Sequence, residues 1–262
     1  MARTVSIPIY FPDWLYRILR SIKHAIVSPP SQSAPVNIVG ERNVEWAFLS
    51  TQMPNGPGEA IEFGCEQGYM SLLAAQKGFH VVANDLQEQS FTWQHPDVEF
   101  LQGDFLKLTL PFNHFDMAIN CSSVEHVGIA GRYGIEVEQS QGDIEVMHRF
   151  AQILKPGGVL LMTAPCGRDA VMAPLCRVYG PERLPKLFAS FSVVKQEYWI
   201  KDEMNRWVRC SREAALSFRP TQHARDPHGC SYALGCFVLR KKLEVSVASE
   251  SGNLRDASLK DA

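Results

Sequence analysis

Short apolar runs that alternate with helical segments constrain the fold of this chain more than any other feature. The apolar runs with strand character are residues 60–63, 80–83, 98–101, 116–120, 159–163, 192–199 and 232–239. The segments with helical character are residues 44–50, 70–77, 86–93 and 144–154, and a further helix is expected to begin at Pro181. Because such alternation places helices on both faces of a parallel sheet, the sequence predicts an α/β fold.

Three parts can be distinguished along the chain. Residues 1–36 contain an amphipathic segment at 10–27 and a linker rich in proline and serine, and residues 37–242 carry the strand–helix alternation. Within this main domain, residues 200–230 are too long for a hairpin turn, which predicts an insertion or cap. Residues 243–262 are polar and lack a core face, as is typical of a disordered tail.

The segment at residues 10–27 combines an apolar stripe with a basic polar face, on which Asp13 is the only acid. Three interpretations stay open. The stripe packs on the main domain as a lid over the functional site, it binds a membrane surface or a partner, or the segment is an acid-poor organellar transit peptide.

Composition excludes several classes of protein. The 26 Lys and Arg residues are balanced by 28 Asp and Glu residues, so the net charge of −2 does not favour nucleic-acid binding. The seven cysteines are odd in number and scattered, which predicts reduced thiols in a cytoplasmic protein. No apolar run approaches the roughly 20 residues of a membrane span. The His and Cys residues between 210 and 230 match no four-ligand zinc spacing, so no metal site is predicted.

A loop with two glycines follows the first predicted strand. Gly64 and Gly68 come directly after Glu62 and Phe63, and a helical segment follows. Glycine lets the backbone approach a ligand closely, and a helix N-terminus offers free N–H groups. A dinucleotide-binding loop requires glycine at the positions that Glu66 and Tyr69 occupy here, so the pattern disfavours NAD and FAD.

Further motifs follow the later strands in order. Asp85 ends the second predicted strand about 20 positions past Gly64, where a carboxylate accepts hydrogen bonds from two ribose hydroxyls; its alternative role is a helix N-cap. Asp104 follows the third strand within the sequence Gly-Asp-Phe. Before the fifth strand, Lys-Pro-Gly-Gly at residues 155–158 ends a helix and turns the chain sharply.

Taken together and in this order, these motifs resemble those of class I S-adenosylmethionine (SAM)-dependent methyltransferases, in the branch that acts on small molecules. The resemblance implies a Rossmann-like fold with a seven-stranded, mainly parallel sheet, helices on both faces, and an N-terminal helical extension. It also implies SAM as the cofactor. The residues that it assigns to the cofactor are Glu62, Phe63, Gly64, Cys65, Glu66, Gly68, Tyr69, Asp85, Leu86, Gly103, Asp104, Phe105, Asn120, Cys121 and Ser122.

Three residues after the fourth strand are candidates for catalysis. His126 follows the end of this strand, where a neutral imidazole can take the proton that an O or N nucleophile must lose. It can instead hold the loop or touch the cofactor, with catalysis by alignment alone, or bind a metal ion. Glu125 is expected to orient His126 or to cap a helix. Tyr133 lies in a loop bounded by glycines that could close over a substrate.

The expected reaction is transfer of a methyl group to an O or N atom of a small molecule, in a biosynthetic pathway. Enzymes that methylate nucleic-acid bases commonly carry two prolines and an aromatic residue after the fourth strand, and Asn120-Cys121-Ser122-Ser123 has neither, so no nucleic-acid substrate is expected. Two alternatives stay open. The protein binds the cofactor or a partner without transferring methyl, or the fold serves a rearrangement or cyclisation. The sequence predicts no oligomeric state.

Overall fold

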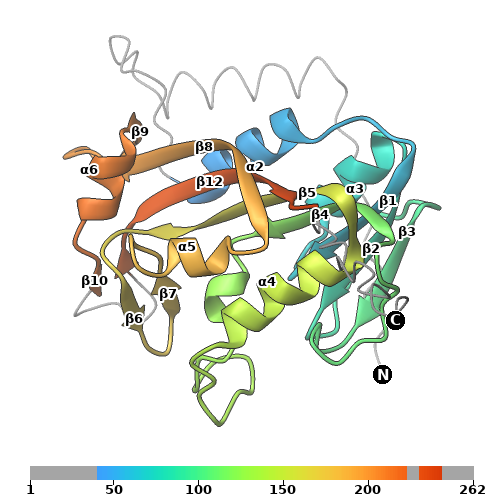
Figure 1. The fold of residues 1–262 in the computed structure, drawn as a ribbon, viewed down its shortest axis with the longest axis horizontal. Helices are drawn as coiled ribbons and strands as arrows, with labels where there is room; N and C mark the ends of the chain where they lie inside the picture. The colour runs from blue at the N-terminus through green and yellow to red at the C-terminus, as the bar shows by residue number, and fades with distance from the viewer. Residues whose placement is uncertain (1–39, 223–229, 244–262) are drawn as a thin grey trace, which may run out of the picture. The chain divides into compact units, whose positions relative to one another are not determined.

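Eight strands form the central sheet in the computed structural model, which describes residues 40–222 and 230–243 (Figure 1). These strands are β1 (Gly58–Phe63), β2 (Phe79–Asp85), β3 (Val98–Gln102), β4 (Phe115–Cys121), β5 (Leu154–Cys166), β8 (Phe191–Lys201), β9 (Trp207–Cys210) and β12 (Ala233–Lys241). Their order across the sheet is β3-β2-β1-β4-β5-β12-β8-β9. Strands β1 to β5 pair in parallel, whereas β12 is antiparallel to β5 and β8. The predicted α/β fold with a mainly parallel sheet is confirmed.

The predicted count of seven strands is wrong, because β9 extends the sheet by an eighth. This strand lies inside the segment 200–230, and it pairs antiparallel with the end of β8. Asp202 makes the reversal between the two strands. Its carboxylate accepts hydrogen bonds from the backbone N–H groups of Met204 and Arg206, at 3.0 and 2.9 Å, and forms an ion pair with the Arg206 guanidinium. This turn depends on the side-chain contacts of Asp202, which the spacing of apolar residues does not predict.

Helices cover both faces of the sheet (Figure 1). On one face, α2 (Glu41–Gln52) and α3 (Tyr69–Gln76) bury Phe48, Leu49 and Ala74. On the other face lie α4 (Gly142–Ile153) and the shorter α5 (Leu184–Leu187) and α6 (Arg212–Ser217). In α4, Phe150 and Ile153 lie on the buried side at helical spacing, which is why this segment is recognisable in the sequence. The helix expected to begin at Pro181 is α5, which begins three residues later, at Leu184.

The helix predicted at residues 86–93 is absent from the described structure, where this segment is irregular, with bends at 86–87 and 92–93. Asp85 accepts a hydrogen bond from the Gln87 backbone N–H at 3.0 Å, which favours a turn over a helix. Phe91 and Trp93, two positions apart, stack with ring centroids 4.7 Å apart, and Trp93 Nε1 donates to the Gln67 carbonyl. A helix would direct residues two positions apart to different sides, so these contacts exclude it.

Several short elements complete the described residues: η1 (Val124–His126), β6 (Ala170–Met172), β7 (Cys176–Val178), β10 (Thr221–Gln222) and β11 (Cys230–Ser231). The expectations for residues 1–36, which include the amphipathic segment at 10–27, and for the tail from residue 244 onward lie outside the described residues. Within the described part of the chain, no helix is long and apolar enough to cross a membrane.

Candidate active site

The carboxyl ends of β1, β2 and β4 meet at one edge of the sheet. The strand register places Phe63 of β1 beside Asn84 of β2 on one side and beside Asn120 of β4 on the other. Since β1 is followed in sequence by β2 but also borders β4, the order of the strands reverses here. In open α/β sheets, ligands bind outside the carboxyl ends of the strands at such a reversal.

The loop after β1 turns tightly over this edge. The backbone N–H groups of Gly64 and Cys65 donate to the Asn84 carbonyl at 2.9 and 3.0 Å, and the Gly68 N–H donates to the Cys65 carbonyl at 2.7 Å. Gly64 and Gly68 both adopt left-handed backbone conformations, with φ of 67° and 65°. A Cβ atom at Gly64 would collide with the Ser123 side chain, so glycine is required where the loop meets the end of β4.

Three residues that the resemblance assigns to the cofactor direct their side chains into the protein. The buried Glu62 carboxylate accepts hydrogen bonds from the backbone N–H and the hydroxyl of Ser71, at 2.8 and 2.5 Å, which fixes the first turn of α3. Burial raises the pKa of Glu62 to about 7, although the bonds from Ser71 oppose this rise. Phe63 and Phe105 pack with ring centroids 4.9 Å apart. In the structure, the side chains of Glu62, Phe63 and Phe105 therefore stabilise the fold through contacts within the protein.

Asp85, at the end of β2, faces the glycine loop. One carboxylate oxygen accepts the Glu66 backbone N–H and the other accepts the Gln87 N–H, both at 3.0 Å. Each oxygen has two lone pairs, so one remains on each for a ligand hydroxyl. Among the described residues no helix directly follows Asp85 for it to cap, and its bonds to these two loop N–H groups are compatible with binding a ligand.

The side chain of Asn84, the residue before Asp85, links the end of β2 to the end of β3. The Asn84 amide donates to the carbonyls of Leu101 and Gly103 at 2.9 and 3.0 Å. This places Asp104 at the same edge, where its carboxylate accepts the Leu106 N–H at 3.1 Å. Leu86 also lies here and is exposed.

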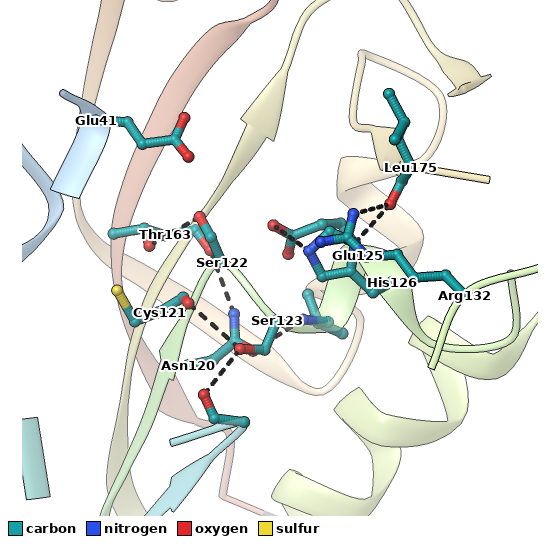
Figure 2. Close-up of polar contacts among 12 residues, drawn as sticks. Glu41, Asn120, Cys121, Ser122, Ser123, Glu125, His126, Arg132, Thr163 and Leu175 are labelled. Carbon is teal, nitrogen blue, oxygen red and sulfur yellow. Dashed lines mark hydrogen bonds and ion pairs between the residues drawn. The ribbon is translucent and has the colours of Figure 1, made fainter. Parts of the chain in front are cut away.

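At the end of β4, a buried amide shapes the chain reversal (Figure 2). Asn120 accepts the Val124 backbone N–H at 3.0 Å and donates to the Thr163 carbonyl at 3.2 Å. The Ser123 hydroxyl lies 3.3 Å from both the Gly64 and the Cys121 carbonyl oxygens. These two carbonyls, one from the loop after β1 and one from the end of β4, are thus held next to each other.

Helix α2 adds to the site two charged residues, Arg42 and Glu45, that belong to none of the sequence motifs. Arg42 Nη1 donates to Glu45 at 2.9 Å and to the Cys121 carbonyl at 3.3 Å, and its Nη2 lies 3.9 Å from Glu66 of the glycine loop. Glu45 is fully buried and also accepts hydrogen bonds from the Ser122 and Thr163 hydroxyls. In the sequence, the only indication of this role is that Glu45 is an acid on the apolar side of the helix predicted at residues 44–50.

His126 is held in one tautomer by the turn between β6 and β7. Its Nδ1 lies 2.7 Å from the Leu175 carbonyl oxygen (Figure 2). A carbonyl oxygen only accepts hydrogen bonds, so Nδ1 carries a proton, and in the neutral ring Nε2 is then the free acceptor. Burial lowers the pKa of His126 to about 4, and the positive charge of Arg132 adds to this effect. The imidazole is therefore neutral at physiological pH.

Glu125 is buried directly behind His126. Its Oε1 lies 3.8 Å from His126 Nε2, and its Oε2 has no hydrogen-bond partner among the described residues. Burial raises the pKa of this carboxyl well above its ordinary value, and the nearby Glu45 adds to the rise. The uncharged acid is the form that this environment favours.

The third candidate, Tyr133, lies against His126. The two rings meet edge-to-face with centroids 5.7 Å apart, and the neighbouring Arg132 donates to the Tyr133 hydroxyl and to the Leu175 carbonyl, both at 2.9 Å. Glu125, His126 and Tyr133, the three candidates for catalysis, therefore lie together in the structure. Arg132 and the Leu175 carbonyl join them through contacts that sequence spacing does not show.

Comparison with known proteins gives one family match. The family model described as "Caenorhabditis protein of unknown function, DUF268" matches residues 67–220. Among curated proteins, a probable SAM-dependent methyltransferase of Mycolicibacterium smegmatis is 27% identical over 125 residues, which are 44% of this chain and 44% of that protein. The match thus spans less than half the length of this relative.

Solved structures share the fold at low identity. The N-methyltransferase NodS from Bradyrhizobium japonicum WM9 is 16% identical, with a TM-score of 0.50 over 78% of this chain and 96% of that one. The [4+2]-cyclase SpnF is also 16% identical, with a TM-score of 0.51 over 88% and 95%. With the curated relative, these likenesses confirm the predicted resemblance to class I SAM-dependent methyltransferases and their Rossmann-like fold.

Proposed function

The chain belongs to the family described as "Caenorhabditis protein of unknown function, DUF268", and we propose that it is a SAM-dependent methyltransferase acting on an O or N atom of a small molecule. The observation that carries the proposal is the position of Asp85. Its carboxylate is bonded to the Glu66 N–H of the glycine loop and keeps a lone pair on each oxygen for the two ribose hydroxyls.

The residues around Asp85 fit the other parts of SAM. The carbonyls of Gly64 and Cys121, which both lie 3.3 Å from the Ser123 hydroxyl, offer acceptors for the ammonium group. Arg42, partly exposed beside the Cys121 carbonyl, offers a guanidinium for the carboxylate.

At the far end of the site, Leu86, Gly103 and Asp104 lie where an adenine ring would follow the ribose. The exposed Leu86 supplies an apolar contact, and the Asp104 carboxylate is an acceptor for the exocyclic amino group. The loop does not suit a pyrophosphate, because the acidic Glu66 lies within it with a largely exposed side chain.

Bound SAM supplies a methyl group on a positively charged sulfur, and the chain's own residues prepare the acceptor. His126 Nε2 takes the proton from the acceptor O–H or N–H, since Nδ1 is committed to the Leu175 carbonyl. Glu125, favoured in its uncharged form behind Nε2, leaves the imidazole neutral and ready to accept this proton. Tyr133 and Arg132 cover His126 from the loop and orient the acceptor for in-line attack.

Calorimetric titration is the first test of the proposal. We expect SAM and S-adenosylhomocysteine to bind at micromolar levels and NAD to show no binding. Incubation with SAM and candidate acceptors should then give products that carry one additional methyl group by mass spectrometry. Binding of NAD without SAM would contradict the proposal. SAM binding with conversion at unchanged mass would indicate a rearrangement or cyclisation, and binding without any conversion would indicate a non-catalytic role.

Replacement of Asp85 by alanine removes the acceptor for the ribose hydroxyls. We expect a loss of about 1.5–3 kcal/mol in S-adenosylhomocysteine binding, as for hydrogen bonds to charged groups. Titration calorimetry of the folded variant measures it. Asp97→Ala is the matched control, because this acid precedes β3 and pairs with His80 instead. Unchanged affinity in Asp85→Ala would reduce Asp85 to a cap of the loop.

A further inference from the structure

The guanidinium of Arg132 is fixed in place beside the candidate base. Nη1 donates to the Leu175 carbonyl and Nη2 to the Tyr133 hydroxyl, both at 2.9 Å. The guanidinium also lies over the Tyr133 ring, 4.7 Å from its centroid. These contacts occupy two of the five N–H donors, so three remain for a ligand.

Arg132 also has no acidic partner within the described residues, although it is partly buried. Two other partly buried arginines, Arg42 and Arg183, differ in this respect. Arg42 pairs with Glu45 at 2.9 Å, and Arg183 forms an ion pair with Asp143. A cation that is partly removed from water without a counter-ion is destabilised. The Leu175 carbonyl and the Tyr133 hydroxyl are neutral acceptors, so they do not supply the negative charge that would stabilise Arg132.

The loop around Arg132 holds an unfavourable backbone conformation. Tyr133 has a φ of 53°, in the left-handed region, between Gly131 and Gly134 with φ of 88° and 76°. A bulky residue adopts this conformation only where its surroundings impose it, and such residues cluster at ligand sites. In this conformation the Tyr133 ring contacts both Arg132 and His126.

We propose that the methyl acceptor carries an oxyanion, a carboxylate or a phosphate, that pairs with Arg132 beside His126. This inference rests on the proposed function and names its class of substrate. A planar guanidinium binds either oxyanion through two parallel hydrogen bonds, and an Arg132 already held by two bonds loses little freedom in doing so. Because Arg132 and His126 share the Leu175 carbonyl, a group bound at Arg132 brings the rest of the acceptor to the imidazole.

Binding of an oxyanion at Arg132 would also raise the pKa of His126. Burial and the positive charges of Arg132, Arg42 and Arg177 lower the pKa of His126, whereas the hydrogen bond to the Leu175 carbonyl raises it. The carboxyl of Glu125 is the acidic group that lies near Nε2, at 3.8 Å. An oxyanion at Arg132 offsets the nearest of these positive charges, so the pKa of His126 rises when the acceptor binds. A higher pKa makes the imidazole a stronger proton acceptor at the moment it is needed.

Three probes of similar shape test the inference on the full chain saturated with S-adenosylhomocysteine: benzoate, phenyl phosphate and benzamide. We expect one of the two anions to bind about 10- to 150-fold more tightly than benzamide, as for a charged hydrogen-bonded pair, and the tighter anion identifies the oxyanion. Arg132→Gln should remove this preference, and Arg132→Lys should keep part of it. Arg240→Gln is the matched control, since Arg240 is exposed and lies opposite Val159 of β5.

The second measurement follows the His126 ring by NMR titration. Arg132→Gln is expected to raise the pKa of His126 above about 4, and the tighter anion should raise it in the wild type but not in this variant. Equal affinity for all three probes, or an anion preference that survives in Arg132→Gln, would overturn the acidic acceptor and leave the methyltransferase proposal standing. Failure to bind S-adenosylhomocysteine would instead overturn the proposed function, and the probes are then compared on the ligand-free protein.

Discussion

Replacement of His126 by alanine is expected to lower the rate of methyl transfer about 10²- to 10⁴-fold, the usual contribution of a general base. Affinity for S-adenosylhomocysteine should stay within a few-fold of the wild type, because the Asp85 carboxylate and the glycine loop do not contact this side chain in the structure. The loss should shrink as pH rises, since an acceptor that is already deprotonated needs no base. Single-turnover rates and calorimetry measure the two quantities.

Two matched variants separate proton removal from loop positioning. His126→Asn keeps a side-chain N–H donor for the Leu175 carbonyl but has no basic nitrogen, so it should be as slow as His126→Ala. His114→Ala, at the other end of β4, removes a partly exposed histidine that lies near Glu59 and should have the wild-type rate. Recovery of activity in His126→Asn would assign His126 to loop positioning, as would a parallel loss of cofactor affinity and turnover in His126→Ala.

The pH profile of the wild type gives an independent check. Since the pKa of His126 lies at about 4, the imidazole is unprotonated throughout the range from pH 5.5 to 8. Titration of this residue should therefore not reduce kcat/KM over that range. An ordinary histidine would halve the active fraction near pH 6.5.

The parts of the site that could be predicted from the sequence depend on residues close together in the chain. The strand, the loop from Gly64 to Gly68 and the following helix form one continuous unit, and Asp85 follows at the end of the next strand. Parallel strands carry their carboxyl ends to the same edge, so these positions become neighbours once the fold is a parallel sheet.

The remaining parts depend on contacts between distant segments. The bond from His126 to the Leu175 carbonyl and that from Thr163 to Glu45 join residues far apart in the sequence, and a backbone carbonyl has no sequence signature. The segment 86–93 failed as a helix because stacking of Phe91 on Trp93 and the turn at Asp85 outweighed its local preference. In each case a tertiary contact, rather than a local pattern, decided the outcome.

Glu62 is expected to make the stability of the protein depend on pH. Its folded-state pKa is about 7, mainly because of burial, whereas the ordinary value is 4.5. Between these two pH values the folded state holds a proton that the unfolded state has lost, so the free energy of unfolding falls as pH rises from 4.5 to 7. At about 1.4 kcal/mol per pKa unit, the loss amounts to about 3 kcal/mol and is complete above pH 7.

Replacement of Glu62 by glutamine should remove this dependence, because an amide does not titrate and its oxygen can still accept from Ser71. Relative to the wild type, Glu62→Gln should gain about 3 kcal/mol at pH 8 and little at pH 4.5, as measured by urea unfolding across the range. Glu59→Gln is the control, since Glu59 is a partly exposed acid on the same strand. Parallel pH profiles for Glu62→Gln and wild type would mean that Glu62 is ionised in the folded protein, with the two bonds from Ser71 outweighing its burial.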